Sequence, residues 1–194
     1  MKNFPAFARR WHRRLSVVIG IQLLLWTLSG LIFALLPIEE VRGEHLLAEG
    51  EPQLRVSATN PNDDSTELPP MTEEEAVAAA KPALINPPEF LSADLVQTAP
   101  NEYRSGDLPA WKIDFADATT LYLDPQTAKV HAVRTTKWRI FDFFWMLHIM
   151  DYDDRDDFNS QLLIIAATFG VLTSISGLAL AFVIYRRRFR SRFQ

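Results

Sequence analysis

The stretch LSVVIGIQLLLWTLSGLIFALL, residues 15–36, carries no charged side chain over 22 residues, and LLIIAATFGVLTSISGLALAFVIY, residues 162–185, carries none over 24. At about 1.5 Å per helical residue, each stretch can cross the roughly 30 Å hydrocarbon core of a bilayer. Backbone amides in lipid must be paired within their own segment, so both stretches are predicted to be transmembrane helices. The first ends in Pro37, Glu39 and Glu40 without a small-x-small cleavage site, so we expect it to be retained rather than removed as a signal peptide.

The distribution of charge predicts the orientation of these helices. All 24 acidic residues lie between Glu39 and Asp157 together with ten Lys and Arg, which leaves that segment at −14. The tails, residues 1–14 and 186–194, each carry five basic residues and no acidic one. Cationic flanks stay in the cytoplasm, so we expect both termini there and the middle segment on the outer side of the membrane. The lipid bilayer is therefore the first expected partner, and nothing in the composition favours nucleic-acid binding.

The middle segment, residues 37–136, is predicted to fold as a small α+β domain. Thr72 and Glu75 have the spacing of a capping box that begins a helix, and Pro82 is expected to stop this helix. Residues 38–51 have the composition of a polar connector. The strands of an antiparallel sheet are predicted at 52–58, 91–98, 110–115, 120–123 and 129–134.

The last two predicted strands flank Asp124-Pro125-Gln126-Thr127, a turn with proline at its second position. The capped helix, laid on one face of the sheet, would bury a core made of Val77, Ala80, Leu95, Trp111, Ile113, Leu121 and Leu123.

Residues 137–150, KWRIFDFFWMLHIM, are rich in aromatic side chains but too short to span a bilayer. We predict a helix on the outer leaflet or against the second span, and a buried core helix of the middle domain is the alternative. Its interfacial residues are expected to be Trp138, Phe141, Phe144 and Trp145. Residues 151–161 are predicted to be a solvated acidic junction, because Asp156 and Leu162 stand where a calcium loop needs Gly and Glu.

Small residues recur along the spans at the spacing that lets membrane helices approach closely. Both spans contain Ser-Gly-Leu, at 29–31 and 176–178, but in antiparallel helices we expect the two pairs to lie at different depths. The predicted helix-packing residues, which would face the other span or a partner subunit, are Gly30, Ala166, Gly170, Ser174, Gly177 and Ala181.

Histidine is the only residue type in this sequence that points to a cofactor, because the chain has no cysteine and lacks HExxH, GxSxG and phosphate-loop motifs. His12 and His148 are predicted on opposite sides of the membrane, so they could not ligate one iron, whereas His45 and His148 share a side. These three are the candidate ligands of a haem b, completed within the chain or by another copy or subunit. The alternative for each is an interfacial or exposed side chain, and His131 is expected at the surface of a strand.

Three stretches resemble the family of PepSY-associated transmembrane proteins: WHRRLSVVIGIQLLLWTLSGLIF (11–33), MTEEEAVAAA (71–80) and AWKIDFADATTLYLDPQTAKVHAV (110–133). The resemblance implies a periplasmic α+β module on a bacterial inner membrane. Larger relatives with four spans resemble haem-bearing reductases of ferric siderophores, or proteins that pass electrons across the membrane. In these relatives, histidines near helix ends carry haem; His12 and His148 match such positions, and Ala128 stands where the family's turn often has Gly.

These observations predict a non-catalytic accessory or scaffold subunit of an inner-membrane assembly linked to electron transfer, with membrane subunits or a second copy as partners. Two alternatives stay open. One is a haem-binding electron-transfer subunit of a ferric-siderophore or quinone-linked reductase, and the other is a periplasmic protein-binding or peptidase-inhibitory module.

Overall fold

The computed structural model describes residues 4–48, 69–104 and 106–191. The chain divides into two compact units, one made of Met1–Phe33 with Phe144–Gln194 and the other of Ala34–Phe143. We call the first the membrane unit and the second the sheet unit. The strand expected at 52–58 lies outside the described residues.

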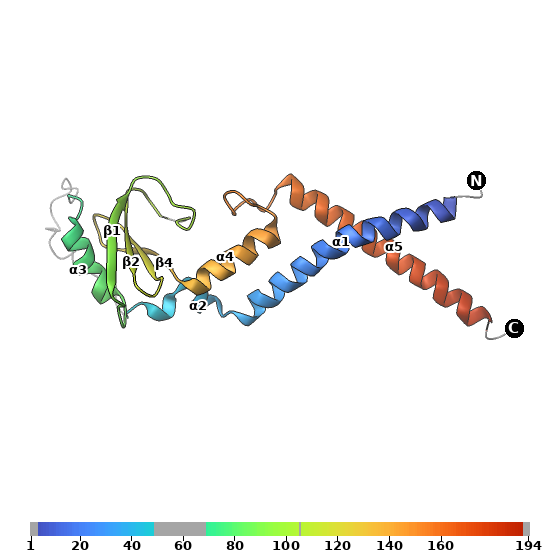
Figure 1. Ribbon diagram of the computed structural model, residues 1–194, viewed down its shortest axis with the longest axis horizontal. Coiled ribbons are helices and arrows are strands. Elements are labelled where there is room, and N and C mark those ends of the chain that lie inside the picture. Colours follow the sequence, from blue (N-terminus) through green and yellow to red (C-terminus); the bar gives the residue numbers. More distant parts are fainter. Residues whose placement is uncertain (1–3, 49–68, 105, 192–194) are drawn as a thin grey trace, which may run out of the picture. The chain divides into compact units, whose positions relative to one another are not determined.

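The membrane unit is built on two long helices, α1 (Phe4–Leu35) and α5 (Gln161–Ser191), which cross each other in Figure 1. Within them, Arg10–Leu35 and Gln161–Arg186 are long and apolar enough to cross a membrane. Only 11% and 6% of their most apolar windows are buried inside the protein. Apolar surface of this extent is stable in lipid rather than in water. The two predicted apolar helices are thus confirmed, and the protein is a membrane protein.

The sheet unit contains a four-stranded antiparallel sheet in the order β1-β2-β3-β4. The strands are β1 (Phe90–Val96), β2 (Ala110–Phe115), β3 (Thr120–Leu123) and β4 (Val130–Arg134). Consecutive strands pair with each other, as short connections favour. The helix α3 (Glu73–Ala83) covers one face of this sheet (Figure 1). The predicted α+β fold is confirmed.

Helix α3 begins as its sequence predicts. Thr72 accepts a hydrogen bond from the Glu75 amide, and the Glu75 carboxylate accepts one from the Thr72 amide, which completes the capping box. Pro82 lies in the last turn, and the helix ends one residue later at Ala83, close to the predicted stop. A face of alanines lets the helix lie close to the sheet, formed by Ala76, Ala79, Ala80 and Ala83.

The core between α3 and the sheet contains most of the residues that the alternation predicts. Ala80, Ile113, Leu121 and Leu123 have no exposed surface, and Trp111 is buried with its indole N–H donating to the Met71 carbonyl at 3.2 Å. Leu95 was predicted in this core and is exposed instead. It lies on β1, at the edge of the sheet, where no described element covers it.

The described part of the predicted connector, residues 38–48, is more ordered than its composition indicates. It contains a short helix, α2 (Ile38–Arg42), and a 3₁₀ turn, η1 (Glu44–Leu46). Gly43 joins them at φ +74°, and a Cβ at this position would lie 2.8 Å from the Val133 side chain. The connector therefore packs on β4, and only glycine satisfies both the backbone angle and the close approach.

The chain leaves β4 and enters α4 (Thr136–Ile149), the aromatic helix. This helix runs through the boundary between the two units, since residues up to Phe143 belong to the sheet unit and the following ones to the membrane unit.

The turn between β3 and β4 is organised by Asp124. Its carboxylate accepts hydrogen bonds from the amides of Gln126 and Thr127, at 2.9 and 2.7 Å, and from the Thr127 hydroxyl at 2.9 Å. Ala128 then adopts φ +62° while fully buried. This left-handed angle explains why glycine suits that position, although alanine tolerates it at a cost of order 1 kcal/mol.

We predict that Asp124→Asn destabilises the protein at pH 7 by about 1 kcal/mol. Burial opposes ionisation of this group, but the hydrogen bonds from Thr127 and Gln126 prevail and hold the pKa of Asp124 below its ordinary value. A carboxyl group with a lowered folded-state pKa stabilises the fold above its unfolded pKa and loses that contribution as pH falls through the folded value.

The difference in unfolding free energy between wild type and variant, measured by near-ultraviolet circular dichroism in detergent, should therefore shrink below about pH 3.5. A difference that stays constant from pH 7 to pH 3 would contradict this account.

Candidate functional site

The two Ser-Gly serines of the membrane unit each contact a histidine from elsewhere in the chain. Ser29 Oγ on α1 lies 2.7 Å from His148 Nδ1 near the end of α4. Ser176 Oγ on α5 lies 2.8 Å from His12 Nδ1 near the start of α1. We call these two contacts the serine–histidine pairs. Ser29 is fully buried, and the other three residues are half-buried.

The direction of these hydrogen bonds follows from the serine protons. Ser29 Oγ lies 2.8 Å from the Leu25 carbonyl and 3.0 Å from the Trp26 carbonyl, and Ser176 Oγ lies 2.8 Å from the Thr173 carbonyl. A hydroxyl has one proton, which these carbonyls take. With the serine protons assigned to these carbonyls, each serine oxygen accepts a hydrogen bond from an imidazole protonated on Nδ1.

The two histidines differ in the contacts of their second ring nitrogen, Nε2. His12 Nε2 lies 3.4 Å from Ser16 Oγ, whose proton it can accept. Among the described residues, no hydrogen bond is made to His148 Nε2, and burial lowers the pKa of His148 below its ordinary value, which favours the neutral ring. The imidazole of His148 therefore presents a free lone pair while Ser29 holds its orientation.

Trp26 gives the end of α4 a second attachment to α1. Its indole N–H donates to the His148 carbonyl at 2.7 Å. This carbonyl is in the last turn of α4, where no later amide of the helix can satisfy it. Phe33 packs edge-on against the His148 ring at 5.4 Å between centroids and lies 6.0 Å from the Trp145 ring. The last turns of α1 and the second half of α4 are thus joined by both polar and aromatic contacts.

The predicted helix-packing residues occupy different surroundings. Gly170 is buried, and a Cβ there would lie 4.0 Å from the Trp26 ring, an ordinary van der Waals distance. The half-buried ones are Gly30, Ala166 and Gly177, and the exposed ones are Ser174 and Ala181. The face of α5 with Ser174 and Ala181 is therefore open to lipid or to another protein.

Of the predicted interfacial residues, Trp138 and Phe141 lie in the sheet unit. The Trp138 ring lies near two guanidinium groups, with the Cζ atoms of Arg134 and Arg104 at 4.3 Å and 5.5 Å from the ring centroid. Arg104 forms an ion pair with Asp142, which is only 4% exposed. These contacts fix the first half of α4 within the sheet unit.

Glu102 adds three further links at the same place. Its carboxylate accepts from the Tyr122 hydroxyl and from Arg139 Nε, both at 3.0 Å, and its main-chain carbonyl accepts from Arg134 Nε at 2.5 Å. Tyr122 alternates with Leu121 and Leu123, so this network lies on the face of the sheet opposite α3. Burial and the neighbouring Glu102 charge raise the pKa of Tyr122.

The predicted interfacial residues other than Trp138 are half-buried: Phe141, Phe144 and Trp145. Trp145 donates its indole N–H to the Arg155 carbonyl at 3.0 Å and packs edge-on against Phe158. It thereby ties α4 to the acidic junction.

Within that junction, Asp151 accepts hydrogen bonds from the amides of Asp157, Asp153 and Asp156, which lower its pKa. In the described part of the chain, no three His, Asp or Glu residues lie together as a metal site would require.

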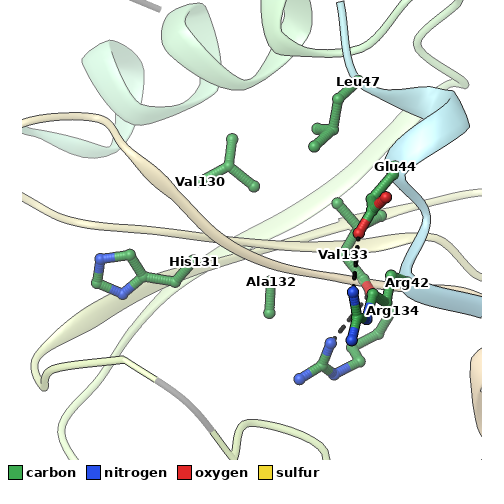
Figure 2. Close-up of a pocket in the computed structure, with 8 residues that line it drawn as sticks. All are labelled: Arg42, Glu44, Leu47, Val130, His131, Ala132, Val133 and Arg134. Atoms are coloured by element: carbon green, nitrogen blue, oxygen red, sulfur yellow. Dashed lines mark hydrogen bonds and ion pairs between the residues drawn. The ribbon is translucent and has the colours of Figure 1, made fainter. Parts of the chain in front are cut away.

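A cleft of about 360 Å³ lies along β4 in the sheet unit (Figure 2). Arg42 of α2, Glu44 of η1 and Leu47, which follows η1, line it on one side, and the rest of the lining is the β4 strand itself. Its charged groups already have partners, because Arg42 pairs with Glu44 at 3.5 Å and Arg134 Nη1 donates to the Val133 carbonyl at 3.2 Å. The cleft shows how the connector lies beside this edge of the sheet.

The two remaining histidines lie in the sheet unit. His45 is exposed on η1. His131, expected at the surface, has a side chain only 13% exposed and lies 2.8 Å from the Tyr103 hydroxyl, which also donates to the Asp107 carbonyl.

Comparison with known protein families identifies the family of this chain. Residues 9–194 match the family described as the PepSY-associated TM region. The chain belongs to this family. No curated protein and no solved structure matches the chain. Membership in the PepSY-associated family confirms the resemblance seen in the three sequence stretches and accounts for the sheet unit and the spans together.

The serine partners of the histidines were missed by the sequence reasoning on this PepSY-associated protein. The repetition of Ser-Gly-Leu in both spans was the available signal, and it was interpreted as helix packing alone. Which histidine reaches which serine depends on how the helices cross, and a single sequence carries no information on that.

We predict that Ser29→Ala removes the acceptor of the His148 Nδ1 proton and lowers stability by about 0.6 kcal/mol, a typical value for a hydrogen bond between membrane helices. In the full-length protein labelled with ¹⁵N-histidine, the wild-type His148 signals should report a ring protonated on Nδ1. In the variant this preference should be lost.

Thr27→Ala is the matched control, because the Thr27 hydroxyl donates only to the Leu23 carbonyl of its own helix. An unchanged His148 tautomer in Ser29→Ala would refute the assigned direction of this hydrogen bond.

Proposed function

We propose that the chain is a membrane-anchored accessory or scaffold subunit of a bacterial inner-membrane assembly, with both termini in the cytoplasm and the sheet unit in the periplasm. The proposal is based on the exposure of the two spans. Only 11% of the most apolar window of the first span and 6% of that of the second are buried inside the protein. A pair of helices that buries so little of itself leaves most of its surface for lipid and for the helices of other subunits.

The charge distribution supports the proposed orientation. The segment from Glu39 to Asp157 carries the whole acidic content of the chain, and five basic residues lie on each tail. Translocating both cationic tails would work against the preference of Lys and Arg for the cytoplasmic side.

The orientation can be tested by single-cysteine labelling, since the chain has no cysteine of its own. We expect Asp117→Cys, on an exposed loop of the sheet unit, to react with a membrane-impermeant maleimide in intact spheroplasts. Arg10→Cys, at the start of the first span, should react only after the membrane is opened. The reverse pattern would refute the proposed orientation.

The role as a subunit can be tested by photo-crosslinking in cells. A photoreactive residue at Ser174 or Ala181, on the exposed face of α5, should give a discrete adduct with another integral membrane protein. The same residue at Gly170, which faces Trp26 of its own chain, is the matched control and should give none. Adducts with lipid alone at both exposed positions would contradict the subunit role.

A second candidate function is haem-dependent electron transfer, and the geometry of His148 favours it. Its Nδ1 proton is held by Ser29, and its Nε2 makes no hydrogen bond in the described part of the chain. An imidazole oriented through one nitrogen and free at the other could hold a haem iron through the free nitrogen. A bound haem b would supply one-electron transfer through its iron.

The geometry also limits this second function. Ser29 is 17 residues from His12, about 25 Å along the helix, so His12 and His148 are too far apart to share an iron. His12 already uses both ring nitrogens. A second ligand to the same iron would have to come from another copy or another subunit.

For this candidate we expect the purified full-length protein to show a Soret band in its reduced-minus-oxidised spectrum. The band should be lost in His148→Ala and kept in His45→Ala, the exposed control. A protein without the band, or a band that survives in His148→Ala, would contradict haem ligation by His148 and leave the scaffold role as the remaining proposal.

A further inference from the structure

The two edges of the sheet have different neighbours within the sheet unit. β1 and β4 are the outer strands. The β4 edge has the connector beside it, with Gly43 against Val133 and the cleft of Figure 2 between them. No strand or helix among residues 4–48, 69–104 and 106–191 pairs with the outer edge of β1. Its unpaired amides and carbonyls are a template for another strand.

The side chains of β1 strengthen this reading. Leu91 is 60% exposed and Leu95 is 37% exposed, although both are large and apolar. A bulge relative to β2 falls between Phe90 and Ser92, so Leu91 is the additional residue and projects from the sheet. Asp94 is the only charged residue of the strand. The bulge is itself a feature that can protect an edge, but β1 has a single charged residue and no proline.

The sequence of β1, FLSADLV, is close to a palindrome centred on Ala93. If a second copy paired with it antiparallel in the centred register, Leu91 would face Leu95 of that copy, and Ser92 would face Asp94. Apolar residues would meet apolar ones, and a hydroxyl could donate to a carboxylate.

Other registers fit worse. A shift of one residue places Ser92 opposite Leu95 and Ala93 opposite Asp94, which removes both matches. A shift of two in one direction places the Asp94 carboxylates opposite each other, where like charges are destabilising, and a shift of two in the other direction places Asp94 opposite Phe90 and Leu91 opposite Ala93. The strand is therefore complementary to itself in one register.

We propose that two copies of this chain associate through antiparallel pairing of their β1 strands, centred on Ala93, which joins their two sheets into one. The two-fold axis of such a pair is perpendicular to the sheet and keeps both α3 helices on the same face. The proposal rests on the membrane anchoring of the proposed function. Confinement of two copies to one membrane raises their effective concentration, so a short contact of about five residues can suffice.

The first test compares charge pairs at the two exposed leucines, in full-length protein reconstituted in liposomes. Leu91→Lys with Leu95→Lys places like charges opposite each other twice and should lower the dimer fraction by about five- to tenfold. Leu91→Glu with Leu95→Lys places opposite charges there and should retain the dimer. Both double variants alter the same exposed positions, so a folding defect would affect them alike.

The second test reads the register through disulfide formation. Copies with Ser92→Cys, mixed with differently tagged copies with Asp94→Cys, should form a mixed disulfide on mild oxidation, because these positions face each other in the centred register. Copies with Ser92→Cys alone should form far less. Lys129→Cys, exposed next to the other edge, is the control that should form none.

Three outcomes would overturn the proposal: an equal dimer fraction in both charge variants, no mixed disulfide, or a disulfide from Ser92→Cys to a different protein in cells. None of these outcomes bears on the orientation of the spans or on adducts at Ser174. The proposed function and the β1 contact can therefore fail separately.

Discussion

The hydrogen bond between His148 and Ser29 is the contact on which the arrangement of the membrane unit depends. An imidazole among apolar side chains needs a hydrogen-bond acceptor for its N–H. A serine in a membrane helix donates its hydroxyl proton to a backbone carbonyl of the same helix. The two needs are complementary, because Ser29 is left with a lone pair and His148 with a proton. The same logic repeats at His12 and Ser176, so a polar contact holds each pairing of helices without introducing a charge.

Helix α4 has a double role because its two halves are held by different forces. Its first half is fixed by ion pairs and stacked guanidinium groups, of which Arg104 with Asp142 is the most buried. Its second half is fixed by the Trp26 indole and by aromatic contacts. A buried ion pair is screened little by salt but requires a charged carboxylate, whereas contacts of indole and aromatic rings with a helix end do not depend on a charge. The two halves should therefore respond differently to the solvent.

The local elements could be predicted from the sequence because each is specified by nearby residues. The Thr72–Glu75 capping box, the alternation in β2 and the turn at Asp124 act over a few positions. The misses came from tertiary contacts. The connector orders because Gly43 packs on Val133, and Leu95 is exposed because no element of the described part of the chain covers it at the β1 edge. The serine–histidine pairs depend on the crossing of helices far apart in sequence, which local patterns do not encode.

The difference between the covered β4 edge and the open β1 edge matters because the surrounding segment is strongly acidic. Between Glu39 and Asp157 the chain nets −14, and a surface so acidic repels indiscriminate partners, including other copies that approach at random. An edge that carries a single carboxylate, Asp94, within such a surface is a gap in this protection. General repulsion combined with a self-complementary register of β1 favours that register, because the other registers lose the matches of Leu91 with Leu95 and of Ser92 with Asp94.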